Sequence, residues 1–272
     1  MVNGFMVTSL KEALEIRSSE NVTPYCGGTD LMIENKEGAT YLFLNKVPEM
    51  KKIVEDNDYI RIGAACTFTE ILNSSIVPKL MKEAVSRIAA PAIRNIGTMG
   101  GNIGNGSAKA DSVLIEYVSD AKVVVASKDR SRIVPIDEFY KGRKQLDLKK
   151  DELIVEILLP KTGLDNYYYK KVGARNALAI SRVSFAGIIK MDGDIIKDIA
   201  IAFGAISGTV LRFKEVEKLF VGKTLSEAKG MKDKFISEYE KKIVPTKGRV
   251  SSEYRKAVCL NLLKDFLTEK GI

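Results

Sequence analysis

Residues 94–112 form the most unusual stretch of this sequence, because small residues and hydrogen-bonding side chains are concentrated there as nowhere else in the chain. Glycines allow the backbone to turn tightly and to approach a ligand closely. Short polar side chains such as Asn102 and Ser107 stand between the glycines and supply donors and acceptors without filling the space of a ligand. A loop of this composition suits phosphates and sugar hydroxyls. Its glycines are Gly97, Gly100, Gly101, Gly104 and Gly106.

A second glycine loop occurs earlier, at residues 24–31. A strand-like segment leads into Gly27 and Gly28, and a hydroxyl and a carboxylate follow at Thr29 and Asp30. Successive amides in such a turn can form an anion-binding nest. If a helix begins at Thr29 or Asp30, the free N–H groups of its first turn face the same anion. Two glycine loops can thus bind one diphosphate.

Glycine clusters also mark turns and bulges that bind no ligand, so a purely structural role stays open for either loop. Neither stretch contains G-x-x-x-x-G-K-[ST], and neither places G-x-G-x-x-G between a strand and a helix. A P-loop or Rossmann nucleotide site is therefore disfavoured.

Composition limits the class of protein. The 272 residues suffice for two domains, and a hydrophobic fraction of 45% with a charged fraction of 29% is typical of globular proteins. The net charge of +8 permits an acidic partner, but acids are interspersed through most basic stretches. We expect no nucleic-acid partner, since no nucleic-acid-binding signature accompanies the charge. A basic nucleic-acid-binding protein with structural glycine loops remains an alternative.

Cysteine and histidine usage is informative by exclusion. Cys26, Cys66 and Cys259 are odd in number and widely spaced, which favours a reducing compartment over a disulfide framework. The sequence has no histidine and no Cys-x-x-Cys, so we predict no histidine-based catalytic triad, no metal ligands and no iron–sulfur cluster held by this chain alone. Without a signal-peptide pattern or a long apolar window, we expect a cytoplasmic protein that does not bind membranes.

Hydrophobic patterning predicts an α+β protein. Capping boxes are expected at Ser9-x-x-Glu12 and Thr67-x-x-Glu70. The polar turn at 161–166 separates a predicted domain 1–163 from a predicted domain 164–272. In the second domain, strand-like segments with a hairpin turn at Asp192-Gly193 precede helical patterns, which implies an α+β arrangement. The expected strands are 167–172, 182–191 and 195–203, and the expected helices are 212–220, 225–241 and 251–270.

Three stretches together resemble a known family. Residues 26–31, 61–70 and 90–105, with Asp111 following, are similar to the FAD-binding subunit of molybdenum hydroxylases, above all to the flavin subunit of bacterial xanthine dehydrogenases. The resemblance runs in order from about Pro24 to Phe203 and more loosely to the C-terminus. It implies a two-lobed FAD-binding domain of the PCMH type, followed by a smaller α+β C-terminal domain with an antiparallel sheet and helices.

The resemblance also implies which residues bind FAD. The first loop would line the diphosphate with its amides and the Thr29 hydroxyl, and the second loop would hold the cofactor from the other side. Asp111 matches a residue that contacts the adenosine portion, Ile154 an aliphatic neighbour of the cofactor, and Lys171 a cation on the flavin side. A solvated strand lysine and an ordinary core isoleucine remain the alternatives for Lys171 and Ile154. The implied residues are Pro24, Tyr25, Cys26, Gly27, Gly28, Thr29, Asp30, Leu31, Thr98, Met99, Gly100, Gly101, Asn102, Asp111, Ile154 and Lys171.

By the same resemblance, the chain is expected to be an electron-transfer subunit without catalytic side chains of its own. A molybdenum-cofactor subunit would hydroxylate a purine such as xanthine, and an iron–sulfur subunit would deliver electrons to FAD, which would reduce NAD. The cofactor supplies the chemistry, and the protein binds and orients it. A standalone FAD-dependent oxidoreductase acting on a small alcohol or amine remains an alternative.

Overall fold

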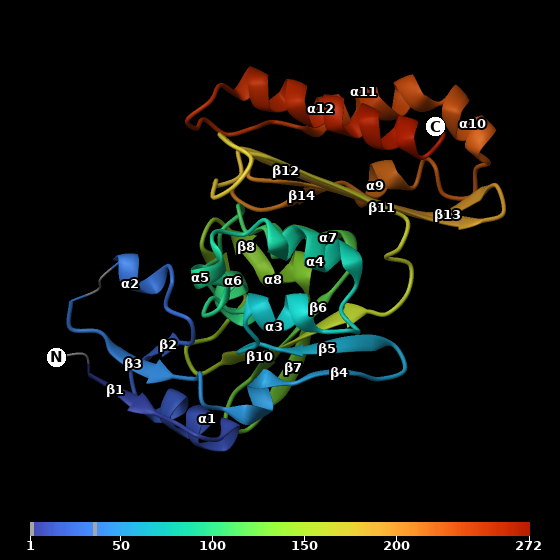
Figure 1. The fold of residues 1–272 in the computed structure, drawn as a ribbon. Coiled ribbons are helices and arrows are strands. Elements are labelled where there is room, and N and C mark those ends of the chain that lie inside the picture. Colours follow the sequence, from blue (N-terminus) through green and yellow to red (C-terminus); the bar gives the residue numbers. More distant parts are fainter. Residues whose placement is uncertain (1–2, 35–36) are drawn as a thin grey trace. The chain divides into compact units, whose positions relative to one another are not determined.

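The computed structural model describes residues 3–34 and 37–272 and divides the chain into two compact units (Figure 1). Neither unit is continuous in sequence, because two helical segments from the first half of the chain belong to the second unit. The first unit comprises Met1–Val77, Ile88–Ser107 and Asp120–Lys161, and the second comprises Pro78–Arg87, Ala108–Ser119 and Thr162–Ile272. The domain division after residue 163 stays a prediction.

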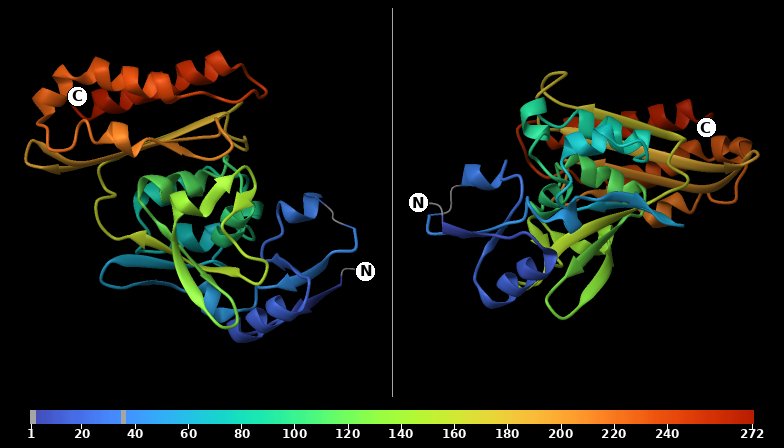
Figure 2. Two further views of the ribbon diagram at one scale, coloured as in Figure 1. Left: turned by 180° about the vertical axis from the view of Figure 1, so that it is seen from behind. Right: turned by 60° about the horizontal axis from the view of Figure 1, so that its bottom comes forward.

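The N-terminal part of the first unit is a small parallel sheet with the strand order β1-β3-β2. Helix α1 packs on this sheet (Figure 2). Ser9 caps α1, since its hydroxyl accepts from the Glu12 N–H, but the predicted capping box is incomplete, because the Glu12 carboxylate accepts from the Thr8 N–H and not from that of Ser9. The elements are β1 (Asn3–Met6), α1 (Leu10–Ser19), β2 (Thr23–Tyr25), α2 (Leu31–Glu34) and β3 (Thr40–Phe43).

The rest of the first unit surrounds an antiparallel sheet with β10 at its centre. A register shift between Ile154 and Glu156 interrupts the pairing of β10 with β6. In order across the sheet, the strands are β4 (Ile53–Glu55), β5 (Tyr59–Gly63), β10 (Leu153–Pro160), β6 (Lys122–Ala126) and β7 (Ser131–Pro135). The remaining elements are η1 (Pro48–Lys51), α3 (Phe68–Asn73), α5 (Pro91–Arg94), α6 (Met99–Gly104), α8 (Ile136–Phe139), β8 (Tyr140–Gly142) and β9 (Gln145–Leu146).

The second unit is an antiparallel sheet with helices on both faces, which confirms the predicted α+β arrangement. Helix α12 packs on β12, where a Cβ on Gly187 would lie 2.8 Å from the Phe266 ring, and α7 packs on the sheet from the other side (Figure 1). The strands are β11 (Tyr167–Val172), β12 (Val183–Asp192), β13 (Ile195–Gly204) and β14 (Leu211–Arg212). The helices are α4 (Lys79–Ser86), α7 (Asp111–Val118), α9 (Lys214–Glu217), α10 (Leu225–Gly230), α11 (Lys232–Lys242) and α12 (Ser252–Glu269).

The helical pattern predicted at 225–241 is two helices, α10 and α11, since α10 ends at Gly230 and Met231 leaves helical geometry. The helix predicted at 212–220 is shorter than expected, because Arg212 pairs in β14 and α9 ends at Glu217. Within the described residues, none of the helices has the length and apolarity needed to cross a membrane.

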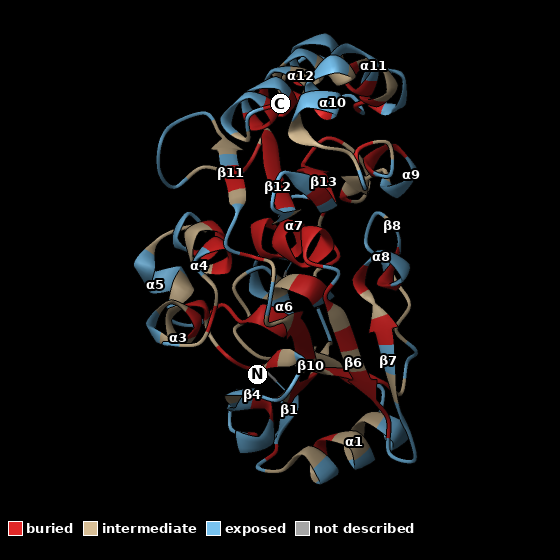
Figure 3. Ribbon diagram, turned by 90° about the vertical axis from the view of Figure 1, so that its right-hand side faces the viewer, coloured by how far each residue is buried: buried red, intermediate tan, exposed pale blue. Residues whose placement is uncertain are grey.

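Helix α7 is buried along its whole length, although it carries two carboxylates (Figure 3). Asp111 at its start has polar partners, whereas neither carboxylate oxygen of Glu116 has a hydrogen-bond partner among the described residues. Burial without a partner disfavours the ionised form, and it raises the pKa of Glu116 to about 8. Glu116 is therefore protonated in the folded chain at neutral pH.

A carboxyl group whose pKa is higher in the folded than in the unfolded chain stabilises folding below its unfolded value of 4.5, and this stability is lost as the pH rises towards about 8. Glu116→Gln removes the titration. We expect the free energy of unfolding of the wild type to fall, relative to that of the variant, by on the order of a few kcal/mol between about pH 5 and pH 8. Chemical denaturation across this range measures the difference. Parallel profiles for the two proteins would contradict the account, and exposed Glu138→Gln is the matched control.

Candidate functional site

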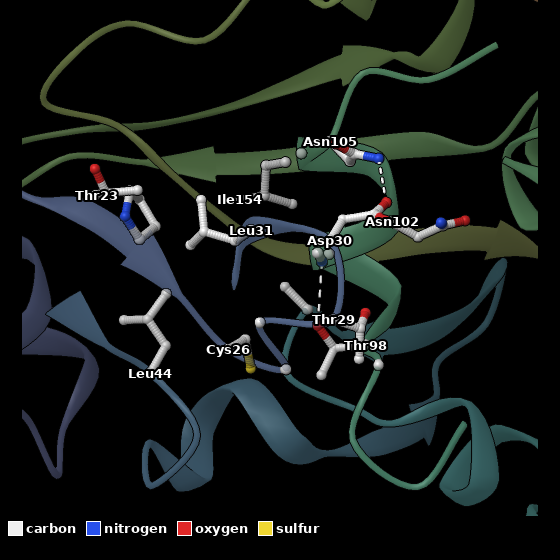
Figure 4. A pocket seen from close by; sticks show the side chains of 18 of the residues that line it. Thr23, Cys26, Thr29, Asp30, Leu31, Leu44, Thr98, Asn102, Asn105 and Ile154 are labelled. Atoms are coloured by element: carbon white, nitrogen blue, oxygen red, sulfur yellow. Dashed lines mark hydrogen bonds between the residues drawn. The ribbon is translucent and has the colours of Figure 1, made fainter. Parts of the chain in front are cut away.

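A cleft of about 390 Å³ in the first unit lies between the two glycine loops (Figure 4). It brings together most of the residues of this unit that the family resemblance implied for the cofactor. These are Pro24, Cys26, Gly27, Gly28, Thr29, Asp30, Leu31, Thr98, Gly100, Gly101, Asn102 and Ile154. The cleft shows that these residues lie close to one another. Their contact with FAD stays a prediction.

Two predicted residues of the first unit do not line the cleft. The Tyr25 ring packs against the rings of Tyr41 and Phe43, at centroid distances of 5.7 and 4.9 Å, and the Met99 side chain is fully buried. Tyr25 and Met99 each adjoin cleft residues in the sequence, and their packed side chains hold the backbone of the two loops in place. Their predicted contact with the cofactor remains untested.

Steric constraints explain why the two loops approach so closely. A Cβ on Gly27 would lie 2.0 Å from the carbonyl oxygen of Ile96, and a Cβ on Gly100 would lie 2.8 Å from that of Ala64. Gly28 has a φ of +66°, in the left-handed region that favours glycine. These glycines are therefore needed for backbone packing whether or not a ligand is bound.

Hydrogen bonds also join the loops. The Asn105 amide donates to the Asp30 carboxylate across the cleft, at 2.5 Å (Figure 4). Thr98 caps α6, because its hydroxyl accepts from the Gly101 N–H at 3.2 Å. Burial raises the pKa of the Cys26 thiol, so that it stays neutral. The two loops thus form one connected wall.

The backbone amides of the two loops differ in their partners. In the second loop, the N–H groups of Met99 and Gly100 donate to the carbonyl oxygens of Cys66 and Ala64, at 3.0 and 2.8 Å. In the first loop, the six N–H groups of residues 26–31 donate to no acceptor within the described part of the chain. These residues are mostly half-buried. Half-buried amides need an acceptor from water or a ligand, so the first loop is the wall of the cleft with donors to offer to an anion.

Polar and apolar side chains occupy different ends of the cleft. Figure 4 shows Leu31, Leu44 and Ile154 grouped on one side, and Asp30, Asn102 and Asn105 on the other. This arrangement suits an elongated ligand with a flat apolar ring at one end and an anionic group in its middle. At the polar rim, Lys144 pairs with Glu34.

Asp111 and Lys171 lie in the second unit and contact each other. The Lys171 ammonium lies 2.6 Å from the Asp111 carboxylate and also donates to the carbonyl oxygen of Arg87, while the Ser181 hydroxyl donates to the other Asp111 oxygen. Burial raises the pKa of Asp111, and the adjacent ammonium opposes that rise. The pair anchors α7 within its unit, and the cofactor contacts of Asp111 and Lys171 stay predictions.

Several cleft residues were not among the predicted cofactor contacts, for example Arg17, Leu44 and Asn105. Asn105 is one of the hydrogen-bonding side chains of the glycine-rich stretch, although the family resemblance did not assign it to the cofactor. Arg17 lies in the last turn of α1, and no local pattern distinguishes it from a solvated helix residue.

Comparisons with known proteins agree with this geometry. Residues 1–162 match the FAD binding domain in molybdopterin dehydrogenase, and residues 167–270 match the CO dehydrogenase flavoprotein C-terminal domain. The glyceraldehyde dehydrogenase medium chain of Sulfolobus acidocaldarius is 32% identical over 92% of this chain and 91% of its own length. The xanthine dehydrogenase FAD-binding subunit of Escherichia coli O157:H7 is 32% identical over 71% of this chain and 69% of its own.

A solved structure extends the comparison to the fold. A chain of carbon monoxide dehydrogenase from Hydrogenophaga pseudoflava superimposes with a TM-score of 0.88 over 98% of this chain and 96% of that chain. At 23% identity this similarity concerns the fold alone. It confirms the predicted fold, a FAD-binding domain followed by a C-terminal α+β domain.

The approach of the loops can be tested by Gly27→Ala. The added methyl group meets the Ile96 carbonyl, so we expect the free energy of unfolding to fall by about 1–3 kcal/mol. Chemical denaturation measures this loss. Gly230→Ala is the control, since a Cβ there meets no atom within 4 Å. Equal stability of the Gly27 variant and the wild type would show that the loops do not touch at this point.

Proposed function

The chain belongs to the family of flavoprotein subunits that carry the FAD-binding domain of molybdopterin dehydrogenases, and from this premise we propose that its FAD binds in the cleft between the two glycine loops. The proposal rests on the six first-loop amides, which have no acceptor among residues 3–34 and 37–272. A diphosphate supplies the acceptors that these amides need. The residues present therefore fit the cofactor.

The role we propose for the side chains of the cleft is to bind FAD and to orient it. The Asp30 carboxylate would repel a diphosphate. The Asn105 amide donates to this carboxylate, which moderates the negative charge of Asp30 and fixes the side chain at the rim of the cleft. The buried side chains of Leu44 and Ile154 exclude water from the apolar end. Bound FAD supplies electron and hydride chemistry. The chain then needs no acid, base or nucleophile of its own.

We further propose that the chain connects one-electron carriers on an iron–sulfur subunit with NAD as the two-electron acceptor, while a molybdenum-cofactor subunit oxidises the substrate. The absence of histidine and of Cys-x-x-Cys supports this division, since redox centres other than FAD would need ligands from partners. The relatives are named as a medium chain and an FAD-binding subunit. Isolation of the native complex with analysis for molybdenum, iron and NAD-dependent turnover tests the assignment.

We propose that the substrate of the complex is a small molecule recognised by the molybdenum-cofactor subunit. A purine such as xanthine is the first candidate substrate to assay. The two relatives are named for glyceraldehyde and xanthine, so substrates differ among proteins with this kind of subunit. A cytoplasmic location is also part of the proposal. It is supported by three free cysteines, Cys26, Cys66 and Cys259, which suit a reducing compartment.

The visible absorption spectrum of the purified chain, with the mass of any released chromophore, tests the binding of FAD. We expect oxidised-flavin bands and the mass of FAD. A chain that stays colourless after incubation with FAD and desalting would contradict the assignment.

Gly101→Val tests where FAD binds. A Cβ at residue 101 would lie 2.8 Å from the Thr98 hydroxyl, so a branched side chain disturbs the cap of α6 at the wall of the cleft. We expect FAD affinity to fall by about ten-fold or more, corresponding to about 1.4 kcal/mol. Fluorescence titration measures the affinity, with Gly230→Val as the control. Unchanged affinity in the Gly101 variant would place the cofactor elsewhere.

A further inference from the structure

Arg17 is a cation at the apolar end of the cleft that the family resemblance did not include. It belongs to the last turn of α1 and lines the cleft together with Thr23 and Leu148. Its guanidinium is fixed by the main chain, because Nη1 donates to the carbonyl oxygen of Val22 and Nε donates to that of Glu152, at 3.4 Å. Arg17 is thus held in one place by residues from two distant segments.

Arg17 forms no ion pair within the described residues, and the Asp151 carboxylate acts on its charge only from a longer distance. Within the described residues, no carboxylate lies at ion-pair distance from its guanidinium, although Glu20 and Asp151 line a neighbouring hollow. Burial lowers the pKa of Arg17, and the negative charge of Asp151 opposes that shift. A guanidinium has five N–H donors, and the two carbonyl oxygens do not use them all. Arg17 can therefore donate to a ligand in the cleft without giving up the bonds that hold it.

The surroundings of Arg17 define what kind of group it would meet. Aliphatic side chains line this end of the cleft, and Figure 4 shows Leu31, Leu44 and Ile154 beside Thr23. On the other side of Arg17, Thr23 and Pro24 lies the second hollow, which is polar and includes Asn21 and Lys150.

FAD offers two ring systems for this place, and the geometry distinguishes them. The cleft, at about 390 Å³, is near the lower limit of about 300–1,000 Å³ for ligand pockets, so its aliphatic end favours the smaller of the two ring systems. Adenine has two fused rings and isoalloxazine three, so adenine is the better fit. Adenine also carries ring nitrogens that accept hydrogen bonds, which match the N–H groups of Arg17. The redox-active ring must instead remain within reach of its partners.

We propose that Arg17 binds the adenine ring of FAD at the aliphatic end of the cleft and is a positioning residue for the adenosine half of the cofactor. This inference rests on the proposed binding of FAD between the glycine loops. In this arrangement the amides of residues 26–31 bind the diphosphate, and Arg17 donates a hydrogen bond to the adenine base.

The test uses the full-length chain freed of flavin and two competing probes, ADP and inorganic pyrophosphate. Arg17→Met keeps the apolar stem and removes the donors. We expect the affinities for FAD and for ADP to fall by about ten-fold, the size of one charge-assisted hydrogen bond, while that for pyrophosphate is unchanged. Exposed Arg249→Met, outside the cleft, is the matched control and should alter none of the three.

Two results of this titration would overturn the proposal. ADP affinity equal to that of the wild type would mean that Arg17 does not touch the base. An equal loss for ADP and pyrophosphate would mean that Arg17 acts through the loop. If wild-type chain binds neither FAD nor ADP, the proposed function itself fails, which is a different outcome.

A second measurement needs no variant, in case Arg17→Met does not fold. Phenylglyoxal modifies arginine side chains, and peptide mass spectrometry reports the rate at each site in the wild-type chain. Saturating ADP should slow modification of Arg17 several-fold and leave Arg249 unchanged. Equal rates at Arg17 with and without ADP would refute the contact.

Discussion

The close approach of two backbone segments is the constraint on which the candidate site depends. The chain at Gly27 passes so near the carbonyl oxygen of Ile96 that a Cβ would lie 2.0 Å from it. Only glycine satisfies this geometry without displacing one of the loops. Because the loops meet there, Asp30 reaches Asn105, and Thr98, which caps α6, lines the same cleft as Cys26. The cleft lies beside this contact between the two loops.

The two loops contribute in different ways once they are together. The second loop uses its amides internally, at Met99 and Gly100, and so forms a fixed wall. The first loop leaves the amides of residues 26–31 without acceptors in the described chain, so it is the wall that can bind an anion. A protein that holds a redox cofactor in this way needs no catalytic side chain. This agrees with a chain that lacks histidine and belongs to a family of FAD-binding subunits.

Local patterns in the sequence predicted much of the fold. The Thr67–Glu70 capping box is present with both reciprocal bonds, and Gly193 turns the β12–β13 hairpin with a φ of +60°. Such features depend on residues a few positions apart, and they can be read without tertiary information. The break between α10 and α11 was missed because the apolar spacing continues across Gly230.

Contacts between distant segments could not be predicted in the same way. The assignment of α4 and α7 to the second unit depends on packing against strands that follow much later in the chain. Arg17 lies in the cleft because it donates to carbonyl oxygens at Val22 and Glu152, one of them 135 positions away. The burial of Glu116 is likewise tertiary, since a glutamate in a short helix is ordinarily expected to face water.

Hydrogen–deuterium exchange of the full-length chain, with and without FAD, tests the anion-binding wall most directly. The amides of residues 26–31 have no acceptors in the described chain, so FAD should slow their exchange markedly, whereas Met99 and Gly100 already donate to carbonyl oxygens and should change little. That contrast within one cleft is the predicted result. Binding of FAD with no added protection at residues 26–31 would contradict the account and place the diphosphate elsewhere.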